Sequence, residues 1–155
     1  MRILHVFDHS IPLQSGYTFR SRALLREQRN RGWETVHVTS GKQGPCATAV
    51  EAVDGLTFHR SAPPASALAQ LPVVNQFAIV NGLASRLREV IAQERPDIVH
   101  AHSPAINGVA ALRAARASKV PVVYEIRAFW EDAAVDHGTS AEGGLRYRLT
   151  RALES

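Results

Sequence analysis

Short apolar runs alternate with stretches of helical periodicity along the chain. Runs rich in Val, Ile and other apolar residues, typical of buried strands, lie at residues 2–7, 34–40, 96–103 and 120–126. A further short strand or hairpin is expected around the turn signal Asp54-Gly55. Several of these runs are apolar on both faces, which indicates a parallel sheet that is covered on both sides.

The stretches between these runs predict helices. The first starts after Gly16, continues to Arg31 and ends at Gly32, and a third begins with Pro104 in its first turn. A long helix from about Val73 to Glu94 carries one apolar stripe, which comprises Phe77, Val80, Leu83, Leu87 and Ile91. A last helix is expected near Glu142 to Leu153, after a loop at 128–141.

The alternation of strands and helices predicts an α/β fold. We expect a single Rossmann-like domain over residues 1–155, with an open parallel sheet and helices on both faces. Right-handed crossovers favour the strand order 3-2-1-4-5.

Composition narrows the possible functions. The single cysteine, Cys46, excludes an internal disulfide and favours a reducing compartment, and no apolar run approaches the roughly 18 residues of a membrane span. We therefore expect a cytoplasmic protein. The net charge is +4, and arginines crowd the first predicted helix. Such a helix suits phosphorylated ligands or an anionic membrane, or is an ordinary solvated surface; the few aromatic residues argue against nucleic acid.

In an open parallel sheet, ligands bind beyond the carboxyl ends of the strands, where the strand order reverses. Three polar segments directly follow predicted strands and are expected to converge there. They are residues 8–18, 100–104 and 125–132.

The loop Ser15-Gly16-Tyr17 lies between a predicted strand and a helix. A glycine here lets a ligand approach the backbone, and the helix N-terminus favours an anion. Neither G-x-G-x-x-G nor a P-loop is present, which argues against an NAD-dependent dehydrogenase.

His100 and His102 share one face of a predicted strand. We expect His100 to be hydrogen-bonded within the sheet layers and His102, at the strand end, to reach the crevice. A metal-dependent hydrolase is an alternative, for which the sequence offers the further ligands Asp8, His9, Asp132, Asp136 and His137. No metal is predicted in the preferred interpretation.

Arg127, Glu131 and Asp132 follow the last clear strand. Arginine suits phosphate or carboxylate, and a nearby carboxylate can act as a general base or orient a sugar hydroxyl. An ion-paired loop at the rim is the structural alternative.

The segments "MRILHVFDHSIPLQSGYTFRSRALLREQRNRGWETVHVTS", "PDIVHAHSP" and "VPVVYEIRAFWED" resemble the N-terminal half of family-4-type, GT-B-fold glycosyltransferases. The sequences of the first and third segments resemble a narrower group of these glycosyltransferases, found with exosortase and exopolysaccharide systems. The resemblance covers nearly the whole chain.

The resemblance implies roles for individual residues. Ser15, Gly16 and Tyr17 are expected to meet the donor diphosphate and the acceptor, and His9, Ser103 and Asp132 to contact substrate. The resemblance also implies catalytic roles for His102, Arg127 and Glu131. Arg127 stands where many relatives carry a histidine.

The resemblance also implies a retaining, metal-independent transfer without a cofactor, from a nucleotide-sugar to a polysaccharide or glycolipid acceptor. Relatives hold the donor mainly with a second domain that carries an E-x7-E motif. Residues 1–155 are therefore expected to be the acceptor-side domain of a longer enzyme, inactive alone. Peripheral contact with the inner membrane through the basic first helix is a further hypothesis. A stand-alone module that binds a phosphorylated metabolite is the alternative.

Overall fold

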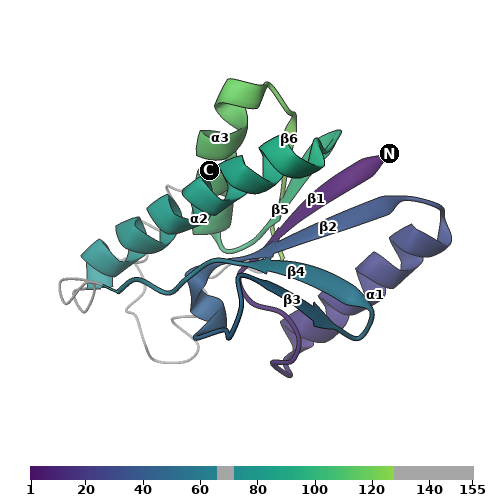
Figure 1. Ribbon diagram of the computed structural model, residues 1–155, viewed down its shortest axis with the longest axis horizontal. Helices are drawn as coiled ribbons and strands as arrows, with labels where there is room; N and C mark the ends of the chain where they lie inside the picture. Colours follow the sequence, from purple (N-terminus) through teal and green to yellow (C-terminus); the bar gives the residue numbers. More distant parts are fainter. Residues whose placement is uncertain (66–71, 128–155) are drawn as a thin grey trace.

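The computed structural model describes residues 1–65 and 72–127 (Figure 1). The elements in chain order are β1 (Arg2–Phe7), α1 (Gly16–Asn30), β2 (Glu34–Thr39), the 3-10 turn η1 (Gly41–Gln43), β3 (Val50–Val53), β4 (Leu56–Arg60), α2 (Pro72–Glu94), β5 (Ile98–His102), α3 (Ala105–Ser118) and β6 (Val122–Glu125).

These strands form one sheet in the order β3-β4-β2-β1-β5-β6. All neighbours are parallel except β3 and β4, which form an antiparallel hairpin. The expected order 3-2-1-4-5 is confirmed for the parallel strands, with β4 as the third, and β3 adds an edge strand. The hairpin turns at Asp54 and Gly55, both of which have positive φ as a tight hairpin turn requires.

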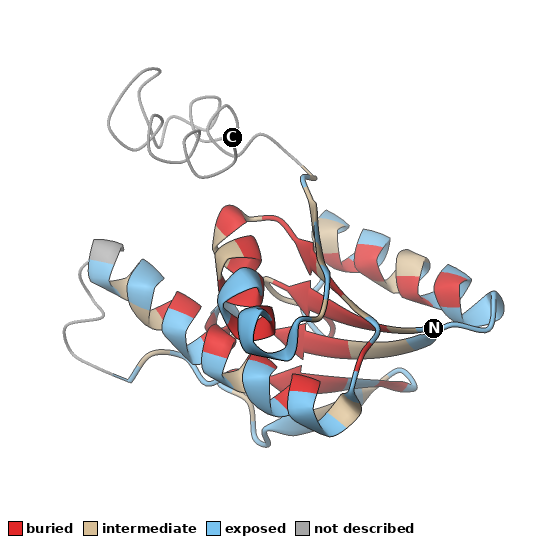
Figure 2. Ribbon diagram, turned by 90° about the horizontal axis from the view of Figure 1, so that it is seen from above, coloured by how far each residue is buried: buried red, intermediate tan, exposed pale blue. Residues whose placement is uncertain are grey.

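Helices cover both faces of the sheet, as predicted. Helices α2 and α3 pack on one face and α1 packs on the other (Figures 1 and 2). The α2/α3 face holds the larger apolar cluster, whose fully buried members include Leu4, Val6, Leu83, Leu87 and Val99. Burying each such side chain stabilises the fold by about 1.5–3 kcal/mol.

The α1 face of the sheet is different in composition. Alternate residues of β1 and β5 that point to this face include the histidines His5, His100 and His102. Helix α1 covers them with a side that buries Thr18, Ser21, Leu25 and Gln28. The apolar cluster here is smaller and consists of Phe7, Ile11, Leu25, Leu56 and Phe58.

Several helix predictions are refined by the structure. Gly32, with φ +79°, follows α1 as predicted, whereas Pro104 precedes α3 as its extended N-cap instead of lying in the first turn. The predicted stripe of α2 is confirmed at Val80, Leu83, Leu87 and Ile91, which are buried, and is wrong at Phe77, which is 57% exposed. The loop at 128–141 and the helix at 142–153 lie outside the described residues. Within the described parts, none of the helices is long and apolar enough to cross a membrane.

Candidate anion site at the carboxyl edge of the sheet

The polar segments predicted to converge do meet beyond β1, β5 and β6. Strand β1 pairs with β2 on one side and β5 on the other, so the strand order reverses beside it. The backbone N–H of Arg127, after β6, donates to Ser103 Oγ, after β5, at 3.1 Å. The ring of Tyr17, at the start of α1, lies 4.8 Å from the Arg127 guanidinium carbon. Glu131 and Asp132 lie outside the described residues.

The N-terminus of α1 is well ordered by its own side chains. Ser15 is the N-cap, and its Oγ accepts from the Thr18 N–H at 3.1 Å while His9 Nε2 lies 2.9 Å from the same oxygen. The Phe19 N–H bonds to the Ser15 carbonyl. The amides of Gly16 and Tyr17 are left without an acceptor in the described parts of the chain. This helix end therefore offers free N–H groups to an anion.

Gly16 is not required by the structure around it. Its φ is not positive, and a Cβ built on it would meet nothing within 4 Å. The space over this residue is open, so the absence of a side chain keeps the backbone accessible.

Tyr17 and Asp8 lie together at one side of the site. The Asp8 backbone N–H donates to the Tyr17 hydroxyl at 3.1 Å, and burial raises the pKa of Tyr17, which keeps the phenol protonated. The Asp8 carboxylate forms an ion pair with Lys42 at 3.2 Å and lies 3.5 Å from His9 Nδ1.

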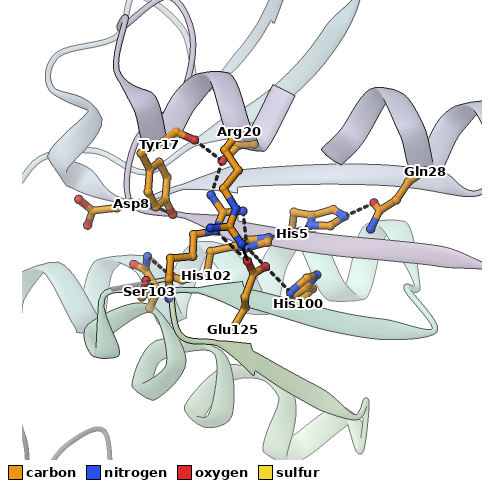
Figure 3. A network of polar contacts seen from close by, with 12 residues as sticks. His5, Asp8, Tyr17, Arg20, Gln28, His100, His102, Ser103 and Glu125 are labelled. Carbon is orange, nitrogen blue, oxygen red and sulfur yellow. Dashed lines mark hydrogen bonds and ion pairs between the residues drawn. The ribbon is translucent and has the colours of Figure 1, made fainter. Parts of the chain in front are cut away.

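Glu125 lies at the centre of the converging groups (Figure 3). Its Oε2 is 2.8 Å from His102 Nδ1 and 3.1 Å from His100 Nε2. Its Oε1 accepts from Arg20 at 3.0 Å and from Arg127 Nε at 3.2 Å. The hydrogen bond from His102, with the neighbouring positive charge, lowers the pKa of Glu125 to about 2, so this carboxylate is ionised at neutral pH.

Arg127 forms part of the wall of the site. Its guanidinium contacts Glu125, Ser21 Oγ at 2.8 Å and His102 Nδ1 at 2.7 Å, while its side chain is only 4% exposed. Its Nε and Nη1 thus donate to acceptors in the protein, its Nη2 has an acceptor at His102 only when that Nδ1 carries no proton, and the Tyr17 ring supports the group.

A buried chain of side chains runs from Glu125 to α1. His102 Nε2 lies 3.0 Å from His5 Nδ1, and His5 Nε2 lies 2.8 Å from Gln28 Oε1. Burial lowers the pKa of His102 to about 4 and that of His5 well below its usual value, so both rings are neutral at pH 7.

The protons of this chain have two consistent arrangements. When His102 Nδ1 donates to Glu125, its Nε2 accepts from His5, and the Gln28 amide turns its NH2 group to His5. When His102 Nδ1 instead accepts from Arg127, His102 Nε2 donates to His5 Nδ1, and His5 Nε2 donates to Gln28 Oε1. The ionised Glu125 favours the first arrangement.

The predicted exposures of His100 and His102 are wrong. His102 is fully buried, because Phe7 stacks on its ring at 4.6 Å and α1 covers it. His100, expected inside the layers, keeps 19% of its side chain exposed beside Glu125.

The set of residues that could hold a metal also differs from the predicted one. Nitrogens of His5, His100 and His102 lie within 4.8 Å of one another. His5 was missed as a member, although the β1–β5 register pairs it with His100. The Arg127 guanidinium beside His102 opposes a cation at that nitrogen, and His5 and His102 already bond to each other.

Sequence reasoning also missed Glu125, Arg20 and Gln28 as parts of the site. The signal was the strand register, because His102 lies opposite Glu125 on the same face of the sheet. The arginines of α1 are mostly engaged within the protein. Arg20 and Arg22 form ion pairs with Glu125 and Asp54, and Arg29 and Arg31 also have partners.

Fold and site together define a Rossmann-like domain that offers free helix amides and positively charged side chains at the carboxyl edge of its sheet. Residues 15–155 match the family model described as a glycosyl transferase 4-like domain. The chain belongs to this family, and it has the fold of the N-terminal half of a family-4-type, GT-B glycosyltransferase. No curated protein matches the sequence.

Solved structures share the fold at low identity. A C-terminal domain of the PF1911 hydrogenase from Pyrococcus furiosus is 16% identical with a TM-score of 0.55, over 80% of this chain and 90% of that one. MurG from Acinetobacter baumannii is 13% identical with a TM-score of 0.52, over 79% of this chain. The chain spans about a third of the MurG structure, with 34% of that chain covered.

Proposed function

We propose that this chain is the acceptor-side domain of a retaining glycosyltransferase, which transfers a sugar from a nucleotide-sugar to a polysaccharide or glycolipid acceptor. The observation that carries the proposal is the open N-terminus of α1 at the strand-order reversal, in a chain of the glycosyl transferase 4-like family. The narrower role in exopolysaccharide synthesis rests on the resemblance of the sequence motifs. The isolated domain is proposed to be inactive.

In this proposal the amides of Gly16 and Tyr17 meet a phosphate of the donor. His9, whose side chain is 25% exposed, contacts the substrate. Ser103, predicted as a substrate contact, is fully buried and supports the site by accepting from the Arg127 N–H. His102 and Arg127 act from within the wall, through Glu125. Glu131 and Asp132 remain proposed acceptor-side carboxylates.

We propose that no metal ion or cofactor takes part in the transfer. What supports this is the positive charge that the protein itself supplies beside the α1 N-terminus, from Arg20, Arg127 and Lys42. Arginine and helix amides can stabilise a departing diphosphate without a cation.

A lipid-linked acceptor would bring the domain to the cytoplasmic side of a membrane. Phe19 and Arg26 lie two turns apart on the exposed side of α1, and Leu13 is exposed before the helix. Binding to anionic vesicles that is lost in Phe19→Ser with Arg26→Gln is the expected result; binding unchanged by both substitutions contradicts this contact.

The test is an assay of the full gene product, including any sequence encoded after codon 155, against a panel of nucleotide-sugars. We expect transfer that survives EDTA, with the anomeric configuration retained in the product by proton NMR. Gly16→Val should lower kcat/KM at least about 100-fold, because the side chain fills the space over the helix amides.

Gly82→Val is the matched control, since a Cβ at this exposed glycine of α2 also meets nothing within 4 Å. Equal activity of the two variants, or an inverted product, contradicts the proposal. A reading frame that stops after Ser155, together with binding of a phosphorylated metabolite by its product, would favour the stand-alone module instead.

A further inference from the structure

The Glu125 carboxylate is surrounded in the way that a bound anion is. Four nitrogen donors contact its two oxygens at 2.8–3.2 Å. They come from three different elements, and we call them the anion cage: Arg20, His100, His102 and Arg127. Two charged arginines and two neutral imidazoles around one carboxyl group suit phosphate oxygens equally well.

The cage has a fixed back and an open front. At the back, Arg127 is held by Ser21 and the Tyr17 ring, and His102 is held by His5. At the front, the Arg20 side chain is 61% exposed and that of Glu125 is 23% exposed. The occupant can therefore change without moving the groups behind it.

The charge of the cage is not matched by its present occupant. Two arginines against one carboxylate leave a net positive charge, because His100 and His102 have lowered pKa values and are neutral. A doubly charged phosphate group would neutralise both arginines, and the displaced carboxylate would gain hydration at the surface.

The cage is next to the free end of α1. Arg20 lies four residues after Gly16, about one helical turn or ~6 Å along the axis. A ligand with two adjacent phosphates can thus contact the amides of Gly16 and Tyr17 with one phosphate and the cage with the other.

We propose that Glu125 is an internal stand-in for a ligand phosphate: it occupies the cage in the free protein, and a diphosphate displaces it. This inference rests on the proposed function, because it assigns the second phosphate of the same ligand. No protein anion is lost in the exchange, and Glu125 moves from the cage to solvent in its ionised form.

The test is an NMR titration with inorganic pyrophosphate of the wild type, Glu125→Gln, Arg20→Gln and Arg88→Gln. Glutamine keeps the shape of Glu125 and removes the competing charge, so Glu125→Gln should bind about tenfold more tightly. Arg20→Gln should bind about tenfold more weakly. Arg88→Gln removes the same charge from an exposed site on α2 without an ion pair among the described residues, and should stay within about twofold.

The carboxyl carbon signal of Glu125 gives a direct readout. In the saturated wild type, the pKa of Glu125 should rise from about 2 toward its ordinary value, since the carboxylate has left its donors. Affinity that is unchanged or weaker in Glu125→Gln, or a pKa that stays low, overturns the proposal. If Glu125→Gln does not fold, Glu125→Asp, which withdraws the carboxylate by one methylene, should still bind more tightly, and weaker binding overturns the proposal equally.

The same spectra separate this inference from the proposed function. Shifts of the Gly16 and Tyr17 amides without tighter binding by Glu125→Gln leave the proposed function standing and remove the stand-in. Tighter binding by Glu125→Gln without shifts of the Gly16 amide supports the stand-in role of Glu125 and contradicts the phosphate contact at the α1 N-terminus. Competition by UDP and by farnesyl diphosphate then distinguishes a nucleotide from a lipid source of the phosphates.

Discussion

The two faces of the sheet are built from different chemistry. The face under α2 and α3 is packed with Leu, Val and Ala side chains, whose contacts are non-directional. The face under α1 buries histidines, Gln28, Ser21 and Thr18 beside a small apolar cluster. Apolar packing tolerates small shifts, whereas hydrogen bonds fix distance and direction. The first face stabilises the domain, and the second places the groups of the site.

Acid should destabilise the domain mainly through the polar face. The pKa values of His37 and His102 are lowered by burial to about 4 from the usual 6.5, and burial lowers the pKa of His5 well below that usual value as well. The unfolded chain therefore takes up these protons first as the pH falls, so stability is complete above pH 6.5 and is lost toward pH 4. Each histidine contributes a slope of about 1.4 kcal/mol per pH unit. Urea unfolding at pH 7, 6 and 5 measures this loss.

His37→Asn sharpens this prediction. The variant removes one of several histidine rings with lowered pKa values and should lower the slope by up to roughly 1.4 kcal/mol per pH unit. A stability that is flat between pH 7 and 5 in the wild type would show that these histidines are not buried as neutral rings.

Leu87→Ala should be the largest single-site loss on the apolar face. Leu87 is fully buried in the α2/α3 cluster, so truncation should cost about 3 kcal/mol of unfolding free energy. Pyrophosphate affinity of the folded fraction should not change. Leu112→Ala, at a position that is 62% exposed on α3, should cost below about 0.5 kcal/mol. A cost for Leu87→Ala similar to that of the control contradicts the division between the faces.

Gln28→Leu should cost less stability but alter the site. It leaves His5 Nε2 buried without a partner, at a cost of about 1–3 kcal/mol. The nitrogen NMR signals of His102 should also shift, because its ring is held through His5. Gln76→Leu makes the same change at an exposed position of α2 and should leave these signals unmoved. Unmoved His102 signals in both variants argue against a connected chain.

Arg22→Gln should have the smallest effect. The ion pair of Arg22 with Asp54 joins side chains that are 39% and 49% exposed, and solvent screens it. A change below about 0.5 kcal/mol in urea unfolding is expected, smaller still in high salt. A loss above about 1 kcal/mol would mean that the outer side of α1 contributes to stability as its inner side does.

Much of the fold could be predicted from local pattern. The hairpin at Asp54-Gly55 and the helix stop at Gly32 depend on residues that tolerate positive φ, which the sequence displays directly. The parallel strand order followed from crossover handedness. The error at Phe77 arose because periodicity gives the apolar side of a helix, here correct for Val80, Leu83, Leu87 and Ile91, but not how far along the helix that side is covered.

The site was predicted only in outline. The convergence of three segments follows from topology, and Ser15-Gly16-Tyr17 lies at the helix start as expected. The role of Glu125 depends on donors from three elements, and the exposures of His100 and His102 depend on where α1 lies. Such contacts arise from tertiary register, which one sequence does not display.

The bond between Gln28 and His5 has a mechanical consequence. Gln28 lies twelve residues after Gly16, about 18 Å along the helix, so it anchors α1 near the far end of the element. A purely apolar interface would let the helix shift along its axis or rotate by a fraction of a turn. The hydrogen bond instead fixes both the axial position and the rotation of α1 relative to β1. Gln28 thereby sets the position of the α1 N-terminus from the opposite end of the helix.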